Sequence, residues 1–463
     1  MQPAVDIASQ VRTGRIRAFD VVEEALRRAE ASQDSLNAFT LIDHDGALAR
    51  ARGIDMLVDT GRDPGPLAGV PIGVKDLIDQ TGLPNTKGSS FDVGYAKKSA
   101  TVVKRLGNAG AVIIGRTGLH EFAFGFTSEN HWFGPVRNPW DTSTSPGGSS
   151  GGSGASVAAG IVPIAIGTDT GGSVRVPAAM CGIFGLKVTH GRVPLTGVYP
   201  LVPSLDTVGP IAANVPDLAA AYLATAGDDP TDPWSQPVEV DSVPANVDLG
   251  DLRFGVVKQW TQPRHTKQVA DGFRSFLESA SAAGIDMVEV NEAGFIEHRA
   301  AARAFGPEVI AIHGEALAAD PDAFGPQTRA RISDASEGTA QDLMAAMRWR
   351  SAAKATLSRL FDSGIDVLVA PTVGGMRKVI GEDDMDVDGE RVFHRKLLAS
   401  FTAPINQIGA PSIAAPVPGT GTPPVSVQLI GPLWGESQLL GIAASLEDAG
   451  VIGAPRAPIF FDD

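Results

Sequence analysis

Apolar residues recur along the chain with two spacings, which predict alternating helices and strands. Steps of three and four residues, with charged residues between them, predict helices. These helices cover 3–32, 45–59, 100–109, 151–159, a segment ending at 283, and 437–449. Short, nearly continuous apolar runs predict buried strands. These strands cover 66–76, 111–115, 162–166, 252–257, 286–290 and 366–370, with one more short strand after a turn near 36–40. The alternation predicts an α/β fold, a sheet covered by helices on both faces.

The chain shows no composition break that divides it into domains. A length of 463 residues would allow two or three domains, yet large α/β enzymes of this size also occur as one domain. The segment 227–245, rich in Asp, Pro and Ser, is the best linker candidate, and it also fits a loop within one fold. We therefore predict a single domain over 1–463.

Charge and cysteine content narrow the function classes. The net charge is −15, and an acidic surface repels phosphate backbones, which disfavours direct nucleic-acid binding. Cys181 is the only cysteine, so no intrachain disulfide can form; we expect it to be a small buried residue. The first residues do not resemble a signal peptide, and the longest apolar stretch, 155–167, is too short to span a bilayer. These features predict a soluble cytoplasmic protein.

Two glycine-rich segments carry serines. The first, 146–154, reads Pro-Gly-Gly-Ser-Ser-Gly-Gly-Ser-Gly; a flexible linker is the common fate of such runs, but apolar sequence follows at once. The second, 167–177, places two glycines directly before Ser173. Consecutive glycines in a turn can point successive backbone N–H groups at the oxyanion that forms when a carbonyl is attacked. Ser173 is therefore a candidate nucleophile that needs a base.

Lysine is the base that the sequence favours. The eight histidines are scattered, with no metal-ligand motif and no G-x-S-x-G element, so a Ser-His-Asp triad stays open but unsupported. Lys75 follows the apolar run 70–74, and burial would favour its neutral form. A single lysine is more often a surface residue. Only its combination with the two serine segments makes Lys75 a candidate base.

Together these segments resemble the amidase signature family of Ser–cis-Ser–Lys amide hydrolases, and the resemblance covers most of the chain. The matching segments are 69–76, 129–130, 133–135, 137–140, 147–153, 167–178, 204–210 and 427–431. The departures are Val188, where the family often has proline, and Leu119 and His120, where it often has methionine and an acidic residue or serine. They put details of the pocket in doubt rather than the reaction.

The resemblance implies a large mixed, twisted sheet with helices on both faces. It also implies N-terminal helices over about 1–60, a signature core over about 61–225, a variable substrate-shaping region over about 227–395, and a return to the core over about 396–463. By the same resemblance Ser173 is the acyl-forming nucleophile, Ser149 the bridging serine and Lys75 the base. The remaining implied roles are an oxyanion hole from the backbone N–H groups of Thr170, Gly171, Gly172 and Ser173, support from Asp169 and Arg175, and substrate contacts at Phe124, Gly125 and Phe126. The alternation of Phe122, Phe124 and Phe126 itself predicts a strand.

The resulting hypothesis is hydrolysis of a carboxamide to a carboxylic acid and ammonia or an amine, without metal or cofactor. Within the family, the alternative is the amidase subunit of a tRNA-dependent amidotransferase, although 199–203 looks more like the stand-alone hydrolases. A second enzyme class, the penicillin-binding type, also uses serine and lysine, and Ser351 and Lys354 form its S-x-x-K motif. The K-T-G element of that class is absent, and the segment resembles a helix face. A nucleotide- or anion-binding module is weaker still, since no P-loop motif is present. The expected partner is a small amide, and a homodimer stays open.

Overall fold

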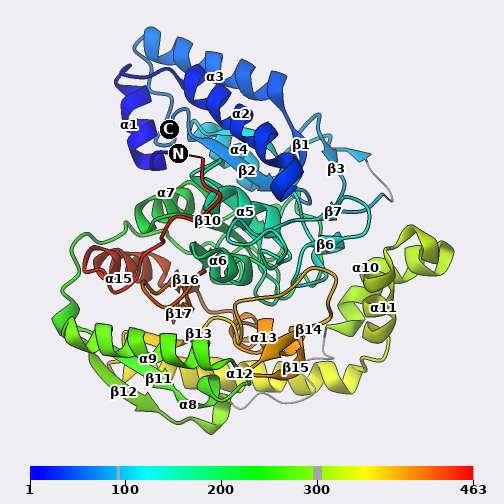
Figure 1. Ribbon diagram of the computed structural model, residues 1–463, viewed down its shortest axis with the longest axis vertical. Coiled ribbons are helices and arrows are strands. Elements are labelled where there is room, and N and C mark those ends of the chain that lie inside the picture. Colours follow the sequence, from blue (N-terminus) through cyan, green and yellow to red (C-terminus); the bar gives the residue numbers. More distant parts are fainter. Residues whose placement is uncertain (91–93, 296–304, 462–463) are drawn as a thin grey trace.

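The computed structural model describes residues 1–90, 94–295 and 305–461. Within these residues the chain forms an 11-stranded sheet and three two-stranded pairs, surrounded by helices (Figure 1). The large sheet contains, in order across it, β1 (Phe39–Ile42), β5 (Val112–Thr117), β2 (Pro71–Lys75), β8 (Ile164–Thr168), β10 (Val208–Ala212), β9 (Phe184–Lys187), β16 (Ser412–Pro416), β17 (Ser426–Ile430), β13 (Val367–Pro371), β11 (Arg253–Val257) and β12 (Asp286–Val290). The small pairs are β3 (Pro84–Asn85) with β4 (Gly94–Tyr95), β6 (Glu129–Asn130) with β7 (Gly134–Pro135), and β14 (Asp384–Val387) with β15 (Glu390–Phe393).

Strand pairing in the large sheet is mixed. Strand β2 is parallel to both β5 and β8, and β11 is parallel to both β12 and β13. Between these groups, β10, β9, β16 and β17 pair antiparallel with their neighbours. The predicted large mixed sheet is therefore confirmed.

Helices cover both faces of the sheet. As a consequence, every residue is buried in the central strands β2, β8, β10, β16, β17 and β13. The helices are α1 (Ala4–Arg12), α2 (Ala18–Leu36), α3 (His44–Asp59), α4 (Thr101–Asn108), α5 (Gly151–Ala158), α6 (Arg175–Cys181), α7 (Val215–Thr225), α8 (Lys258–Thr261), α9 (Lys267–Ala282), α10 (Gly306–Ala319), α11 (Pro326–Ala335), α12 (Ala340–Asp362), α13 (His394–Leu398), α14 (Ala403–Ile408) and α15 (Glu436–Asp448). Figure 1 shows α1–α3 gathered at one end of the molecule and α8, α9 and α12 at the other.

The C-terminal residues return to the N-terminal helices, and Figure 1 places both chain ends beside α1. Arg28 of α2 donates from Nη1 to the carbonyls of Gly160 and Phe461, and Phe461 N donates to Ala159 O.

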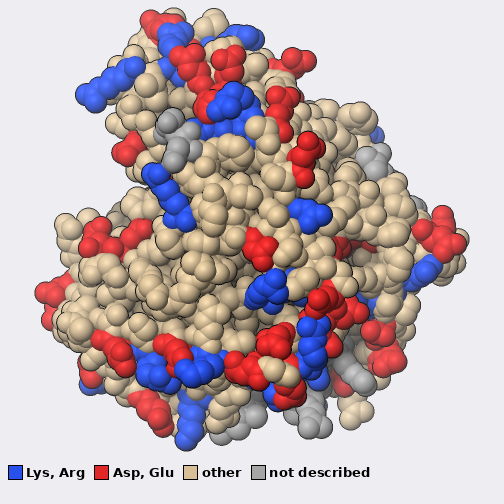
Figure 2. Space-filling view, in the orientation of Figure 1, with Lys and Arg blue, Asp and Glu red and all other residues tan. Residues whose placement is uncertain are grey.

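The described residues contain no helix with the length and apolar character to cross a membrane. On the face in Figure 2, acidic and basic side chains are intermixed; exclusion of nucleic acid stays a prediction.

Several predicted boundaries differ from the structure. The predicted helix 3–32 is two helices, α1 and α2, because Gly14 takes a left-handed φ of 68° and turns the chain between them. The alternating phenylalanines do not form a strand, so that prediction is wrong. Phe122 lies in a short 3₁₀ turn (Glu121–Ala123) with φ of 51° and packs against Tyr199, His313 and Phe324. The linker candidate 227–245 contains neither helix nor strand.

Candidate active site

The site lies where two parallel strands of the large sheet end side by side. Lys75 is the last residue of β2, and Thr168 is the last residue of the neighbouring strand β8. Lys75 Nζ lies 2.7 Å from Ser149 Oγ and 2.8 Å from Thr168 Oγ1. The carboxyl ends of parallel strands are a common place for ligand and catalytic groups in α/β proteins. The strand order therefore carries the lysine to a serine that is far away in the sequence.

Burial changes the protonation of this lysine. The Lys75 side chain is fully buried. Burial lowers the Lys75 pKa to about 7, although the charges of Asp169 and Asp206 oppose the shift. A large fraction of Lys75 is therefore a neutral amine near pH 7, with a lone pair that can accept a proton.

Ser149 lies just before α5, in a loop held by backbone contacts. The peptide bond between Gly148 and Ser149 is cis. The carbonyl oxygen of Ser149 accepts hydrogen bonds from His120 N and Ser128 Oγ, both at 3.1 Å. A side chain at Gly148 would place its Cβ 2.7 Å from Thr127 N, so the loop requires glycine there. These contacts fix the Ser149 hydroxyl against Lys75.

Ser173 lies in the adjacent loop, between β8 and α6. Its carbonyl oxygen accepts from Ser150 N at 3.3 Å, so the two serine loops are joined through their backbones. The side chain is 4% exposed and lines a cavity of about 400 Å³. Among the hydrogen bonds of residues 1–90, 94–295 and 305–461, none involves Ser173 Oγ. The structure therefore joins Lys75 to Ser149 directly, and joins the Ser173 loop to the Ser149 loop through the backbone.

The loop that carries Ser173 presents backbone N–H groups. Gly172 N already donates to Asp169 Oδ1 at 2.8 Å. Within the described part of the chain, the N–H groups of Thr170, Gly171 and Ser173 make no hydrogen bond. Gly172 has φ of 135°, and a Cβ there would lie 2.3 Å from Thr402 Oγ1, so only glycine fits. The loop thus leaves three amides for a ligand, rather than the four that the resemblance implies.

Asp169 and Arg175 form a buried ion pair beneath this loop. Arg175 donates from Nε to Asp169 Oδ2 at 3.0 Å and from Nη2 to Oδ1 at 3.1 Å, and both side chains are fully buried. Burial opposes ionisation of Asp169, but the Arg175 and Lys187 charges and a hydrogen bond from Asn406 hold its pKa at about 2. The carboxylate is charged at neutral pH and ties the Ser173 loop to α6 and α14.

Replacing Asp169 with asparagine should lower the free energy of unfolding by about 3–5 kcal/mol, because a buried guanidinium loses its counter-charge. The matched control is Asp286→Asn, which removes an exposed ion pair with Arg253 and should change the free energy by less than about 1 kcal/mol. Urea denaturation of both variants, followed by circular dichroism, measures the difference. Equal midpoints for the two variants would contradict a stabilising role for the buried pair.

Several contacts of the site could not be found from the sequence. Thr402 Oγ1 donates to Gly171 O at 2.7 Å, and Arg175 Nη1 donates to Gln428 Oε1 at 3.0 Å. Thr170 Oγ1 donates to the buried Asp206 at 2.5 Å. The sequence assigns no role to Thr402, Gln428 or Asp206, although the latter two lie in segments that match the family. The fold brings them to the Ser173 loop from distant parts of the chain.

The cavity beside Ser173 has mostly apolar walls. Phe124, Gly125 and Phe126 line it, as the resemblance implies for substrate contacts, together with residues of the 201–205 segment. Cys181 lies outside this lining; it is fully buried, and burial raises its thiol pKa, which fits the predicted structural role. Among the described residues, no cluster of His, Cys, Asp and Glu could hold a metal ion.

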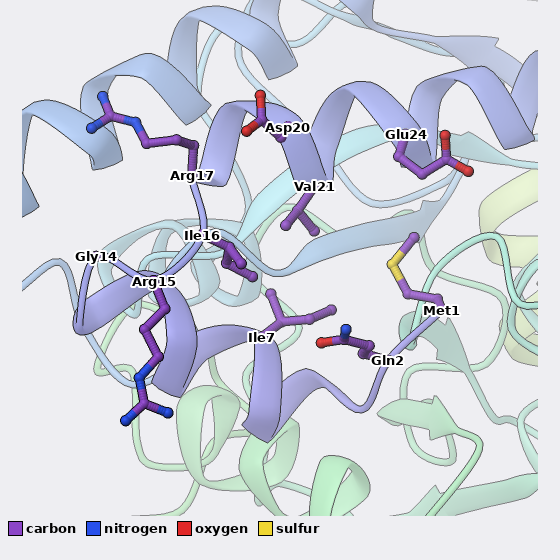
Figure 3. A pocket seen from close by; sticks show the side chains of 10 residues that line it. All are labelled: Met1, Gln2, Ile7, Gly14, Arg15, Ile16, Arg17, Asp20, Val21 and Glu24. Carbon is purple, nitrogen blue, oxygen red and sulfur yellow. The ribbon is translucent and has the colours of Figure 1, made fainter. Parts of the chain in front are cut away.

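Another cavity, of about 390 Å³, lies between α1 and the beginning of α2 (Figure 3). Its lining residues are Met1, Gln2, Ile7, Gly14, Arg15, Ile16, Arg17, Asp20, Val21 and Glu24. It contains none of the predicted site residues and mixes charges of both signs. The predicted site residues Thr170, Gly171 and Ser173 line the other cavity instead.

The chain is similar to known proteins in both sequence and structure. A family model described as Amidase matches residues 20–440. The chain is 37% identical to AtzE, the 1-carboxybiuret hydrolase subunit of Pseudomonas sp. (strain ADP), covering 96% of this chain and 98% of that protein. It is 33% identical to a glutamyl-tRNA(Gln) amidotransferase subunit from Salinispora arenicola (strain CNS-205), covering 96% of each. A solved structure described as a vestigial complex that reveals the origins of an s-triazine catabolic enzyme is similar, with a TM-score of 0.90, 36% identity, and coverage of 98% of this chain and 100% of that one.

Proposed function

The chain belongs to the amidase signature family and is an amide hydrolase, and we propose that Ser173 is its nucleophile, Ser149 its bridging serine and Lys75 its base. The observation that carries this assignment is the fully buried Lys75 amine, 2.7 Å from the Ser149 hydroxyl. A lysine with a pKa of about 7 can act as a base at neutral pH. Hydrogen bonds at catalytic groups often tighten only when substrate binds, so a rotation of the Ser173 side chain completes the relay.

In the first half of the reaction, Ser173 Oγ attacks the amide carbonyl carbon. Its proton passes to Ser149 Oγ, while the proton of Ser149 passes to the neutral amine of Lys75. The tetrahedral intermediate then collapses and the C–N bond breaks, while Ser149 gives its proton to the leaving nitrogen and takes one back from Lys75. A hydroxyl can serve both steps because it donates and accepts. The products of this half are an acyl ester on Ser173 and ammonia or an amine.

In the second half, water attacks the ester and gives its proton to the same relay. The Ser173 oxygen recovers a proton as it leaves, and the carboxylic acid is released. The oxyanion formed in each half is assigned to the free amides of Thr170, Gly171 and Ser173. A donor in such a site contributes about 3 kcal/mol to transition-state stabilisation. Asp169 and Arg175 act through the backbone, because they position the loop that carries these amides.

The chain is similar both to a 1-carboxybiuret hydrolase subunit and to glutamyl-tRNA(Gln) amidotransferase subunits. An assay of substrates, with and without partner subunits, therefore has to distinguish the two candidate functions. The S-x-x-K motif does not support an enzyme of the penicillin-binding type, because Ser351 lies within α12 and donates to Met347 O. We place the enzyme in the cytoplasm, since its single buried cysteine needs no oxidising compartment.

The purified chain, without added partner subunits, should release ammonia from small primary carboxamides. A panel of aliphatic, aryl and urea-like amides, followed by ammonia detection and by mass spectrometry of the acid product, measures this activity. Glutamine, assayed with and without amidotransferase partner subunits, is the contrasting substrate. Glutamine cleavage that depends on those partners, with no cleavage of other amides, would favour the amidotransferase alternative.

A further inference from the structure

The cavity beside Ser173 carries positive charge on one wall. Arg395 and Lys396 of α13 and Gln407 of α14 line it, together with the apolar Phe124 and Phe126. No Asp or Glu is among the described residues that line it. A cavity with apolar walls and a few convergent polar groups sets the orientation of a ligand through those groups. Here the polar groups are cations and hydrogen-bond donors.

Arg395 is the cation that most needs a ligand. It is only partly exposed, and burial lowers its pKa, with a weaker opposing effect from Asp334. Within the described residues, the Arg395 side chain makes no ion pair or hydrogen bond. An unpaired guanidinium in an apolar cavity costs free energy unless an anion pairs with it.

A second arginine strengthens this positive field. Arg331 of α11 donates to the carbonyl of Phe124 and contacts His120 Nε2, so it lies behind the aromatic wall. Burial and the nearby charge of Arg395 lower the Arg331 pKa to about 10, which leaves it charged at neutral pH. Of the two charged guanidiniums, Arg395 thus lines the cavity and Arg331 lies behind Phe124.

Gln407 is oriented by a neighbouring arginine. Arg350 of α12 donates from Nε to Gln407 Oε1, and from Nη1 to Ser204 Oγ at 3.3 Å. Ser204 in turn donates to Glu308 Oε1 at 2.6 Å, which fixes the arrangement. With its oxygen engaged by Arg350, Gln407 has its Nε2 free of hydrogen bonds within the described residues. Its two N–H groups remain for an acceptor in the cavity.

We propose, on the basis of the proposed function, that the substrate carries a carboxylate on its acyl part, bound by Arg395 with Gln407 and Lys396. A guanidinium matches a carboxylate with two parallel hydrogen bonds, and the Gln407 amide adds a neutral donor. Lys396, which is exposed, adds charge at the rim. The substrate class is therefore the monoamides of dicarboxylic acids and related acids, rather than neutral or cationic amides.

The same wall disfavours an amino acid substrate. Glutamine carries an α-ammonium group beside its carboxylate, and that cation would need an acidic partner. The described lining provides only cations and neutral groups for it. The chemistry of this cavity thus differs from what a glutaminase needs.

The test compares acids with uncharged amides of the same shape. Succinamate and glutaramate are each paired with the neutral diamides succinamide and glutaramide, and kcat/KM is measured for the unaltered chain and for Arg395→Gln. A charge-assisted hydrogen bond is worth roughly a 10- to 100-fold preference, so the better acid should exceed its diamide by about that factor. Arg395→Gln should remove most of this preference by lowering kcat/KM for the acid far more than for the diamide.

Arg391→Gln is the matched control, because Arg391 is an exposed arginine on the adjacent β15 that pairs with Glu382. It should leave the preference for the acid in place. Equal cleavage of acid and diamide, or an equal loss on both in Arg395→Gln, would overturn the inference while the hydrolase assignment stands. If none of the four probes is cleaved, calorimetric binding of succinate to Ser173→Ala decides: binding that Arg395→Gln weakens at least tenfold supports the inference, and no binding overturns it.

Discussion

Replacing Ser173 with alanine should reduce kcat for amide hydrolysis by roughly 10⁴- to 10⁶-fold, the loss seen when a serine hydrolase loses its nucleophile. The variant can no longer form the acyl ester, whereas the cavity and the backbone amides remain. Since the side chain makes no hydrogen bond within the described residues, the loss of its hydroxyl should hardly change the fold. Ammonia release from the best amide of the panel measures the effect.

Ser153→Ala is the matched control for this experiment. Ser153 belongs to the same glycine-rich segment as Ser149 but donates to Ile166 O at 3.1 Å and bonds Thr117 Oγ1 at 2.7 Å, so its role is structural. Its kcat should stay within about tenfold of the unaltered chain, because neutral hydrogen bonds contribute only about 1 kcal/mol each. Mass spectrometry after treatment with a sulfonyl fluoride should show one adduct, on Ser173. Undiminished hydrolysis by Ser173→Ala would remove Ser173 from the mechanism.

The sequence revealed those elements whose pattern is local. The run 70–74 is apolar at almost every position, which predicts a strand buried on both faces, and β2 covers Pro71–Lys75. The glycine-rich composition of 147–154 fits both a flexible linker and an ordered loop. The apolar sequence that follows predicts an ordered loop, and α5 and β8 confirm that prediction.

Strands β9, β10, β16 and β17 were not predicted, although they form the centre of the sheet. Strand β10 reads Val-Gly-Pro-Ile-Ala, and a glycine followed by proline usually indicates a turn. Pairing with β8 over five residues overrides that preference. The helices α10 and α11 lie in the segment that sequence reasoning could describe only as variable.

The positively charged residues that line the cavity could not be predicted from the sequence either. Arg395 and Gln407 lie more than two hundred positions after Ser173 in the sequence, and neither belongs to a motif. Only the return of α13 and α14 to the Ser173 loop brings them into one cavity, through contacts such as Thr402 with Gly171 O. A family signature can therefore locate the reaction, but the substrate is set by residues that the signature does not contain.

Replacing Lys75 with methionine should lower kcat/KM by roughly 10²- to 10⁴-fold, the contribution expected of a general base. Methionine fills much of the same buried space but cannot accept the proton from Ser149. In the unaltered chain, kcat/KM should rise with pH through about 7 and then level off, since only the neutral form of Lys75 is a base and its pKa is about 7. The remaining activity of Lys75→Met should lack this rise, and a pH profile from about 5.5 to about 9, which spans that pKa, measures both effects.

Lys187 offers a demanding control, because burial lowers its pKa to about 7 as well, but it donates to the carbonyls of Val188 and Ala410. Lys187→Met should cost stability, as two buried acceptors lose their donor, yet its kcat/KM should still rise through a pH of about 7. If Lys187→Met lost that rise and Lys75→Met kept it, the titrating base would be Lys187 and not the amine beside Ser149. A rise that both variants keep would mean that neither lysine sets the pH dependence. Comparing Lys75→Met with Lys187→Met thus shows whether the pH dependence comes from the lysine in the proton relay or from any buried lysine that titrates near pH 7.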